Sequence, residues 1–357
     1  MFGRSVLPTV ARIGSLCGGL MYDWLQRVWY EGAPSGVVLW PLSWLFRGVV
    51  VLRRRLYVAG ILRSFAVGRP VVVVGNISVG GTGKTPLTIW LARQLADGGL
   101  RVGVASRGYG GSARSARLVT ANDDPAVAGD EPVLIARSTN ARVAVGADRV
   151  EVARLLAGQG CEVILADDGL QHLRLRRDVE IAVVDGQRRF GNGRLLPAGP
   201  LREPVARLQS VAAVVVNGGA SQPPEIGMSM ALLDAVSLAD PTRSRPLGTF
   251  CGQPVHAVAA IGNPGRFFDL LRRAGVAPIE HPWPDHAAPD VRFHDRLPVL
   301  MTEKDAVKCR ALADERHWYV AVRAQIAAAD AERLLRIVLA GIGRRELPVI
   351  AARQPAR

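Results

Sequence analysis

The sequence predicts an α/β protein, in which a mostly parallel sheet flanked by helices is followed by a second, smaller α/β domain. Two observations predict the sheet. Strand-like and helical patterns alternate from residue 71 onward, which is typical of parallel strands joined by crossover helices. A run of four valines, Val71–Val74, leads directly into a glycine-rich turn and the sequence Gly-Lys-Thr. A separate apolar stretch near the N-terminus predicts a helix at a membrane interface.

The glycine-rich turn is predicted to bind nucleotide phosphates, as the loop of P-loop NTPases does. Glycines lack a Cβ and let backbone amides close around phosphate oxygens at a helix N-terminus. Lys84 supplies a positive charge to the β- and γ-phosphates, and the Thr85 hydroxyl suits magnesium. Ser78 departs from the usual G-x-x-x-x-G-K-[ST] pattern, so a turn in an ordinary α/β domain is the alternative. The predicted nucleotide-binding residues are Ser78, Val79, Gly80, Gly81, Thr82, Gly83, Lys84 and Thr85.

The chain divides into three predicted segments. Strands are expected at 71–74, 102–105, 143–145, 163–166, 181–184 and 211–216, with helices at 86–97 and 147–157. A glycine- and proline-rich stretch, 218–247, predicts a domain boundary. Beyond it, strands at 255–261, 299–301 and 319–322 and helices at 265–274 and 328–340 form the smaller unit. We therefore expect a membrane-associating helical segment at 1–58, a phosphate-loop domain at 59–234 and a smaller α/β domain at 235–357.

Composition indicates a folded protein with anionic partners. Hydrophobic residues make up 49% of the 357 residues, and the formal net charge is +14. Nucleic acid, an anionic membrane surface and phosphorylated substrates all fit this charge. Because no element combines basic and aromatic residues for base recognition, no nucleic-acid partner is expected. The four cysteines are isolated from one another, which favours ordinary thiols in a reducing cytoplasm.

The most hydrophobic stretch, residues 37–52, is shorter than the roughly 20 residues that span a bilayer and contains Arg47. Trp40 and Trp44 lie on one face of the predicted helix, and the basic run Arg53–Arg55 follows. This combination predicts a helix lying in the membrane interface, and a buried core helix is the alternative. No signal peptide is expected, and Met21 is an alternative start to Met1.

Two adjacent carboxylates, Asp167 and Asp168, follow the predicted strand at 163–166. An aspartate in that place is the usual partner of a phosphate loop, because magnesium prefers hard oxygen ligands. Neighbouring residues of an extended chain point to opposite sides, so one carboxylate faces the metal and the other a different group. A turn or a helix cap is the alternative for this pair.

Other candidates are less specific. Asp130 precedes an apolar helical stretch, where it is either a helix cap or a general base. Arg202, in the turn-rich loop 192–204, is suited to a phosphate, although a surface pair with Glu203 explains it equally well. His286 follows an aspartate that orients or charges it. The charged turn 302–308 is either solvated or reaches a nucleotide held between the domains.

Taken together, these segments resemble the tetraacyldisaccharide 4′-kinase family of lipid A biosynthesis. The resemblance covers about residues 24–308 and rests on segments in family order. Ser78 fits it, since a hydroxyl residue in that position is similar to the family's own loop. The segments are 75–86, 106–111, 129–132, 167–172, 192–204, 262–264 and 301–308.

The resemblance implies a membrane-associated kinase that uses ATP and Mg²⁺ to phosphorylate the 4′-hydroxyl of a tetraacyldisaccharide 1-phosphate, which gives lipid IVA. It implies Asp130 as the catalytic base, assisted by His286, although Ala287 and Ala288 depart from the expected pattern after the histidine. It also implies Thr85 and Asp167 as metal ligands and Asp168 as a catalytic residue. The implied residues on the side of the lipid substrate are Arg107, Gln171, His172, Arg202 and Glu203.

The expected partners are the acylated disaccharide phosphate and the anionic surface of the cytoplasmic face of the inner membrane, where the protein is peripheral or monotopic and a monomer. The leading rival is a membrane-recruited P-loop switch ATPase. Loops of that class usually carry an extra lysine where this chain has Val79. A nucleotide-binding scaffold without activity is a third hypothesis, against which the candidate base and the paired aspartates argue.

Overall fold

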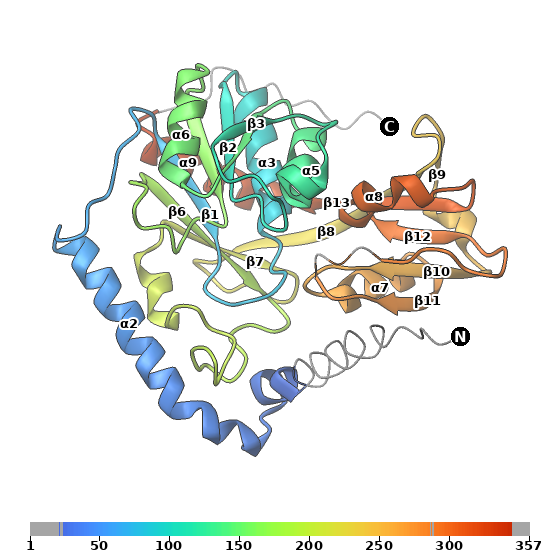
Figure 1. Ribbon diagram of the computed structural model, residues 1–357, viewed down its shortest axis with the longest axis horizontal. Helices are drawn as coiled ribbons and strands as arrows, with labels where there is room; N and C mark the ends of the chain where they lie inside the picture. The colour runs from blue at the N-terminus through green and yellow to red at the C-terminus, as the bar shows by residue number, and fades with distance from the viewer. Residues whose placement is uncertain (1–20, 22–23, 286, 288, 345–357) are drawn as a thin grey trace, which may run out of the picture.

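The computed structural model describes residues 21, 24–285, 287 and 289–344. The predicted N-terminal extension, residues 1–20, and the predicted catalytic residue His286 lie outside these residues. Within the described part, thirteen strands form one sheet that runs through the whole molecule. Two lobes of unequal size are built on the two halves of this sheet (Figure 1).

The larger lobe contains the predicted parallel sheet. Strand β1 (Val71–Gly75) lies at its centre between β5 (Val163–Asp167) and β6 (Val179–Asp185), and all three run parallel. The ends of the six predicted strands differ from those observed by at most two residues. The remaining strands of this lobe are β2 (Val102–Ser106), β3 (Arg117–Val119), β4 (Arg142–Val145) and β7 (Ala213–Asn217).

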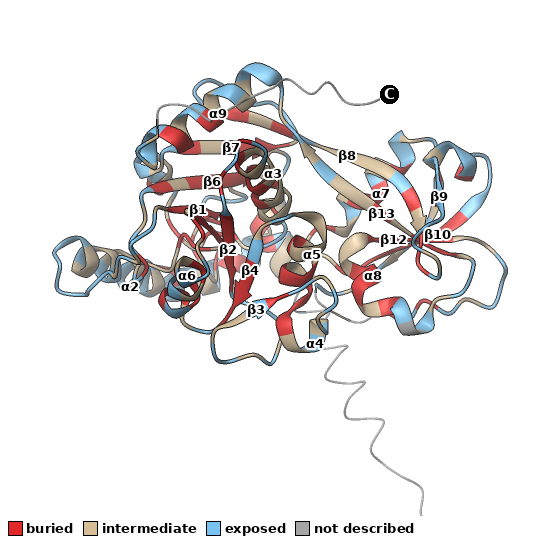
Figure 2. Ribbon diagram, turned by 90° about the horizontal axis from the view of Figure 1, so that it is seen from above, coloured by how far each residue is buried: buried red, intermediate tan, exposed pale blue. Residues whose placement is uncertain are grey.

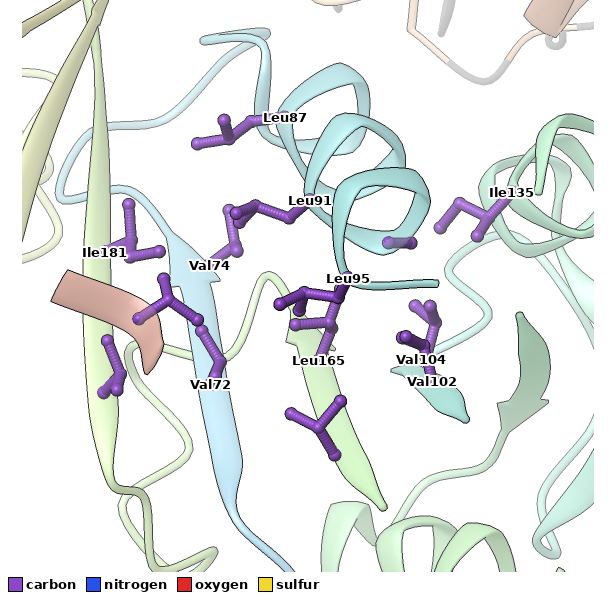
Figure 3. Close-up of a cluster of buried hydrophobic side chains, with 14 of the residues drawn as sticks. Val72, Val74, Leu87, Leu91, Leu95, Val102, Val104, Ile135, Leu165 and Ile181 are labelled. Atoms are coloured by element: carbon purple, nitrogen blue, oxygen red, sulfur yellow. The ribbon is translucent and has the colours of Figure 1, made fainter. Parts of the chain in front are cut away.

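Helices cover both faces of this sheet. Helix α3 (Lys84–Asp97) packs on β1 through Leu87, Leu91 and Leu95, whose four-residue spacing forms one apolar stripe. Figure 3 shows these leucines lying over Val72, Val74 and Leu165. Because these strands run parallel, their carboxyl ends lie along one edge of the sheet. The other helices of the lobe are α4 (Pro125–Ala128), α5 (Asp130–Ser138), α6 (Arg149–Gly158) and the 3₁₀ turn η3 (Val205–Ser210).

Strand β8 (Ile226–Ser237) connects the two lobes. Its first residues pair in parallel with β7, and the rest pair antiparallel with β13 (His317–Gln325). The sequence predicted a domain boundary within 218–247, with the division placed after residue 234. This division falls inside the continuous strand β8.

The smaller lobe continues the sheet beyond β13. Its strands are mostly parallel, and the strand order of the whole sheet is β11-β10-β12-β13-β8-β7-β6-β1-β5-β2-β4-β3, with β9 paired to β8. The elements not yet given are the strands β9 (Ser244–Arg245), β10 (Pro254–Ala259), β11 (Ala277–Pro282) and β12 (Val299–Thr302), the helices α7 (Pro264–Arg273) and α8 (Glu303–Cys309), and the 3₁₀ turns η4 (Leu247–Phe250) and η5 (Arg310–Leu312).

The chain returns to the larger lobe after β13. Helix α9 (Ala328–Gly341) buries Leu334 and Val338 in the same core cluster as Ile181 of β6 and Val215 of β7. Asp330 of α9 also accepts a hydrogen bond from the backbone amide of Gly227 in β8, at 2.9 Å. The larger lobe is therefore completed by residues that follow the smaller lobe in the chain. Figure 2 shows that the buried residues concentrate in the strands and on the inward faces of the helices.

The N-terminal segment forms a long helical arm beside the larger lobe (Figure 1). A short π-helical turn η1 (Arg27–Glu31) and a 3₁₀ turn η2 (Pro34–Leu39) lead into α2 (Trp40–Val58). The helical stretch Pro34–Val58 has 25 residues and contains an 18-residue window with a mean hydropathy of 1.6, so that by length and composition alone it could cross a membrane. It is longer than the predicted 37–52, because the arginines that follow are good helix formers and continue the helix.

Candidate active site

The phosphate loop has the predicted backbone. Gly80 and Gly83 adopt φ values of +100° and +96°, in the region that favours glycine, and α3 begins at Lys84. A Cβ on Gly83 would lie 2.4 Å from the Nδ2 of Asn217, which donates a hydrogen bond to the carbonyl of Thr82 at 2.9 Å. The end of β7 thus holds the loop in place and leaves the N-terminus of α3 directed at the cleft.

Asp167 lies at the end of β5 and is 1% exposed. Thr88 donates a hydrogen bond to its Oδ1 at 3.0 Å, and the Thr85 hydroxyl lies 3.4 Å from its Oδ2. Burial, together with the negative charges of Glu131 and Asp168, raises the pKa of Asp167. A buried carboxylate beside a hydroxyl offers the hard oxygen ligands that Mg²⁺ prefers. This donor set therefore fits the metal that the sequence predicted.

Asp168 faces a different group from its neighbour, as expected for adjacent residues. Its φ of +50° turns the carboxylate toward Lys84 Nζ at 3.6 Å and Arg202 Nη1 at 3.3 Å. Burial alone raises the pKa of Asp168, but the positive charges of Lys84 and Arg202 outweigh it, so that the pKa lies below its usual value. Asp168 is therefore ionised, and it links the phosphate loop to the loop that carries Arg202.

Arg149, which was not among the predicted site residues, is 3% exposed at the start of α6 and lines the cleft. Its Nη2 donates to the carbonyl of Asp167 at 3.1 Å, whereas its Nε and Nη1 find no hydrogen-bond partner among the described residues. Burial lowers its pKa to about 10, so it stays charged at neutral pH. A cation at a helix N-terminus is unfavourable unless an anion is near. The feature of the sequence that could have identified Arg149 as a site residue is its position just after β4.

These groups line a cleft of about 970 Å³ between the two lobes. The larger lobe contributes the phosphate loop and the ends of several strands, and the smaller lobe contributes Asn263, Phe267, Glu303 and Lys304 among others. The predicted residues that line it are Gly80, Gly81, Thr82, Gly83, Lys84, Thr85, Arg107, Asp167, Asp168, Gln171, His172 and Arg202. Burial, with the positive charges of Arg149 and Arg107, lowers the pKa of His172 to about 4, so that this side chain is neutral at pH 7.

Asp130 lies beside this cleft but does not line it. It is the first residue of α5, 4% exposed, and its Oδ1 accepts a hydrogen bond from the amide of Glu131 at 2.9 Å. Its Oδ2 lies 3.0 Å from Lys308 Nζ. The adjacent Glu131 lines the cleft, as does Lys304. Gly129, rather than Asp130, occupies the N-cap of the helix.

Glu203 does not line the cleft. It is 6% exposed, and its Oε2 lies 3.2 Å from Nε of the buried Arg207. Gln171 donates to its Oε1 at 2.8 Å and to the carbonyl of Asn76 at 2.9 Å. Glu203 thus anchors the loop from which Arg202 reaches Asp168. The predicted nucleotide-binding residues Ser78 and Val79 also lie outside the cleft lining, at the base of the phosphate loop.

Comparison with known proteins adds three findings. Residues 36–340 match the family model of tetraacyldisaccharide-1-P 4′-kinase. A tetraacyldisaccharide 4′-kinase of Xanthomonas campestris pv. campestris is 50% identical over a 321-residue alignment, and the match covers 84% of this chain and 92% of that protein. Its counterpart from Methylobacillus flagellatus is 47% identical over a 320-residue alignment, and the match covers 87% of this chain and 95% of that protein.

Among solved structures, the chain is similar to LpxK from Aquifex aeolicus, an "apo" form crystallised in complex with ATP. The TM-score is 0.72 at 28% sequence identity, and the match covers 86% of this chain and 99% of that one. The likeness therefore extends over both lobes and the cleft between them.

Proposed function

The chain belongs to the tetraacyldisaccharide-1-P 4′-kinase family, and we propose that it transfers the γ-phosphoryl group of ATP to the 4′-hydroxyl of a tetraacyldisaccharide 1-phosphate, which gives lipid IVA. The observation that carries the proposal is the family match over residues 36–340, a range that contains every predicted site residue. The rival switch ATPase lacks such support, since the relatives that match over most of the chain are kinases.

ATP is proposed to bind with its triphosphate on the phosphate loop. The backbone amides of Gly81 to Thr85 and the helix N-terminus are suited to phosphate oxygens, and Lys84 adds an ammonium group. The relative from Aquifex aeolicus was crystallised with this nucleotide. Arg149 supplies a second buried positive charge at the same end of the cleft, and its two unsatisfied nitrogens are available to an anion.

Mg²⁺ is proposed to bind Thr85 and Asp167. When bound, the metal neutralises charge on the transferred phosphoryl group. Among the described residues no three acidic, histidine or cysteine side chains converge as a metal cluster. That arrangement agrees with Mg²⁺, which is usually held by one or two carboxylates together with phosphates and water.

Asp130 is proposed as the general base toward the acceptor hydroxyl, with assistance from His286, and Asp168 as a catalytic residue near the phosphates. The carboxylate of Asp130 is 4% exposed, so that proton transfer requires a local rearrangement that lets the hydroxyl reach it. Arg107, Gln171, His172 and Arg202 are proposed to contact the lipid substrate. For Glu203 we propose an indirect contribution, because it holds the loop of Arg202 through Arg207.

The protein is proposed to act as a monomer on the cytoplasmic face of the inner membrane. Helix α2 exposes apolar side chains and carries Arg47 and Arg53–Arg55, which suits an anionic surface. The net charge of +14 favours the same surface and a substrate that already carries phosphate.

The test is incubation of the full chain with γ-labelled ATP, Mg²⁺ and tetraacyldisaccharide 1-phosphate. We expect label on the 4′ position of the distal sugar, and Asp130→Asn to lower kcat by about 10²–10⁴-fold with ATP affinity retained. Asp269→Asn, at an exposed ion pair on α7, is the matched control and keeps wild-type turnover. Hydrolysis of ATP without labelled lipid would favour the switch ATPase.

A further inference from the structure

We infer that Lys308 is a positioning residue for Asp130: its ammonium group, supplied by the smaller lobe, fixes the carboxylate that acts on the acceptor hydroxyl. This inference rests on the proposed function, because it assumes that Asp130 is the base. It gives a role to the charged turn 302–308, for which the sequence predicted either solvation or contact with a nucleotide.

The ammonium group of Lys308 is enclosed by oxygen atoms. Its Nζ lies 3.0 Å from Asp130 Oδ2, 3.1 Å from the carbonyl of Ala287 and 3.8 Å from Asp305 Oδ1. The side chain of Lys308 is 12% exposed and that of Asp130 is 4% exposed, so water screens this pair little. Since the amide of Glu131 holds the other oxygen of Asp130, the two contacts together fix the plane of the carboxylate.

Helix α8 is itself anchored, so that Lys308 has little freedom. Thr302 caps the helix by accepting from the amide of Asp305 and donates to the carboxylate of that residue at 2.6 Å. The same carboxylate accepts from the amide of Ala260, just beyond β10, at 2.9 Å. Asp305 is 0% exposed. The position of Lys308 is therefore fixed relative to the sheet of the smaller lobe.

A second lysine lies one turn earlier on the same face of α8. Lys304 Nζ lies 3.2 Å from Glu131 Oε1, 3.1 Å from Asp285 Oδ1 and 3.8 Å from Asp130 Oδ2. Burial alone lowers the pKa of Lys304, but the carboxylates of Glu131, Asp130 and Asp285 outweigh it and raise the pKa. The two lysines join α8 to the N-terminus of α5 where the lobes meet, and these helices lie side by side in Figure 2. The orientation of Asp130 is thereby coupled to the relative position of the lobes.

The use of lysine in this chain supports a specific role. Of the 45 lysines and arginines, three are lysines, namely Lys84, Lys304 and Lys308. One is in the phosphate loop and the other two face Asp130. An ammonium group is a compact point charge, whereas guanidinium is a planar fork that needs more room. The enclosed space among three oxygens explains why arginine, used nearly everywhere else, does not occupy position 308.

The experiment compares wild type with Lys308→Ala and Lys308→Arg in the kinase assay. We expect Lys308→Ala to lower kcat by about 10²-fold, the effect of a base misplaced by about 1 Å, while the KM for ATP changes less than threefold. Lys308→Arg should remain impaired. Added ethylammonium should restore kcat of Lys308→Ala in a saturable way, because it returns an ammonium group to the vacated space, and tetramethylammonium at equal ionic strength should not.

Four outcomes of this comparison are informative. Wild-type kcat in Lys308→Ala overturns the inference, and so does a loss of kcat that follows the loss of folded protein and does not respond to ethylammonium. Asp130→Asn with wild-type turnover would overturn the proposed base instead. If Asp130→Asn is inactive while Lys308→Ala is active, the base assignment stands and only the role of Lys308 fails.

Discussion

Arg207 is a buried cation on which two carboxylates depend. It is 3% exposed, and it lies 2.6 Å from Glu180 Oε1 and 3.2 Å from Glu203 Oε2. Burial alone raises the pKa of Glu180, but its hydrogen bonds to Arg207 and Arg177 outweigh it and lower the pKa. Glu203 has no second arginine within ion-pair distance among the described residues. Removal of Arg207 would leave the buried carboxylate of Glu203 without its ion pair, and Gln171 would remain its side-chain hydrogen-bond donor among the described residues.

We therefore predict that Arg207→Met lowers the free energy of unfolding by about 3–5 kcal/mol, the range for breaking one side of a buried ion pair. Urea unfolding followed by circular dichroism measures it. Arg174→Met is the matched control, because the Arg174 side chain is 55% exposed and its ion pair with Asp148 should contribute less than about 1 kcal/mol. Equal destabilisation by the two variants would contradict the prediction.

This network shows what local sequence can and cannot predict about a site. The phosphate loop and the pair Asp167 and Asp168 were predictable, because their chemistry follows directly from a strand and a helix in the same stretch of chain. Glu203 was not, since its burial depends on Glu180 and Arg207 together. Arg149 was passed over because an arginine at the start of a helix resembles an ordinary surface residue until the fold covers it.

At the scale of single elements, helix α2 presents an apolar surface that nothing in the described part of the chain covers. Trp44 and Leu45 are 64% and 67% exposed, whereas Ser43 on the inner side donates a hydrogen bond to the carbonyl of Leu195 at 2.8 Å. Arg194 also stacks on the ring of Trp40, at 3.7 Å from its centroid. The arm is thus fixed on its inner side and free on its outer side.

We predict that the double change Trp44→Glu and Leu45→Glu lowers binding to anionic phospholipid vesicles by at least about tenfold, because burial of each large apolar side chain contributes about 1.5–3 kcal/mol. Activity on substrate dispersed in detergent should remain, since neither residue lines the cleft. Co-sedimentation with vesicles measures the binding. The matched control is Ile279→Glu with Leu312→Glu, two exposed apolar residues of the smaller lobe. Vesicle binding equal to wild type would argue against α2 as the contact.

Six strands of the larger lobe were predictable because they are largely buried and appear as continuous apolar runs, whereas the short, partly exposed β3 was not predicted. Strand β8 was not predicted. It changes partner along its length, from parallel pairing with β7 to antiparallel pairing with β13, and its burial therefore follows neither an alternating nor a continuous pattern. Nearby glycines and prolines suggested a linker, and the fold uses this stretch as a shared strand.

At the scale of the whole molecule, the order of segments in the chain differs from their distribution between the lobes. Leu334 of α9 belongs to the core cluster of the larger lobe, whereas Leu271 of α7, earlier in the sequence, belongs to a cluster of the smaller lobe. No pattern within the sequence indicates which lobe a terminal amphipathic helix will cover, because any exposed apolar face of a sheet can accept it.

This arrangement makes a prediction about which lobe each helix stabilises. Leu334 and Leu271 are both 0% exposed, so replacement of either by alanine should cost about 2–5 kcal/mol. Since local unfolding follows contiguous packed units, Leu334→Ala should reduce the hydrogen-exchange protection of β6 and β7 first, and Leu271→Ala that of β10 and β12. Native-state exchange read by mass spectrometry distinguishes the two. If Leu334→Ala released β10 before β6, α9 would stabilise the lobe next to it in sequence, and the packing of the larger lobe around its last helix would be incorrect.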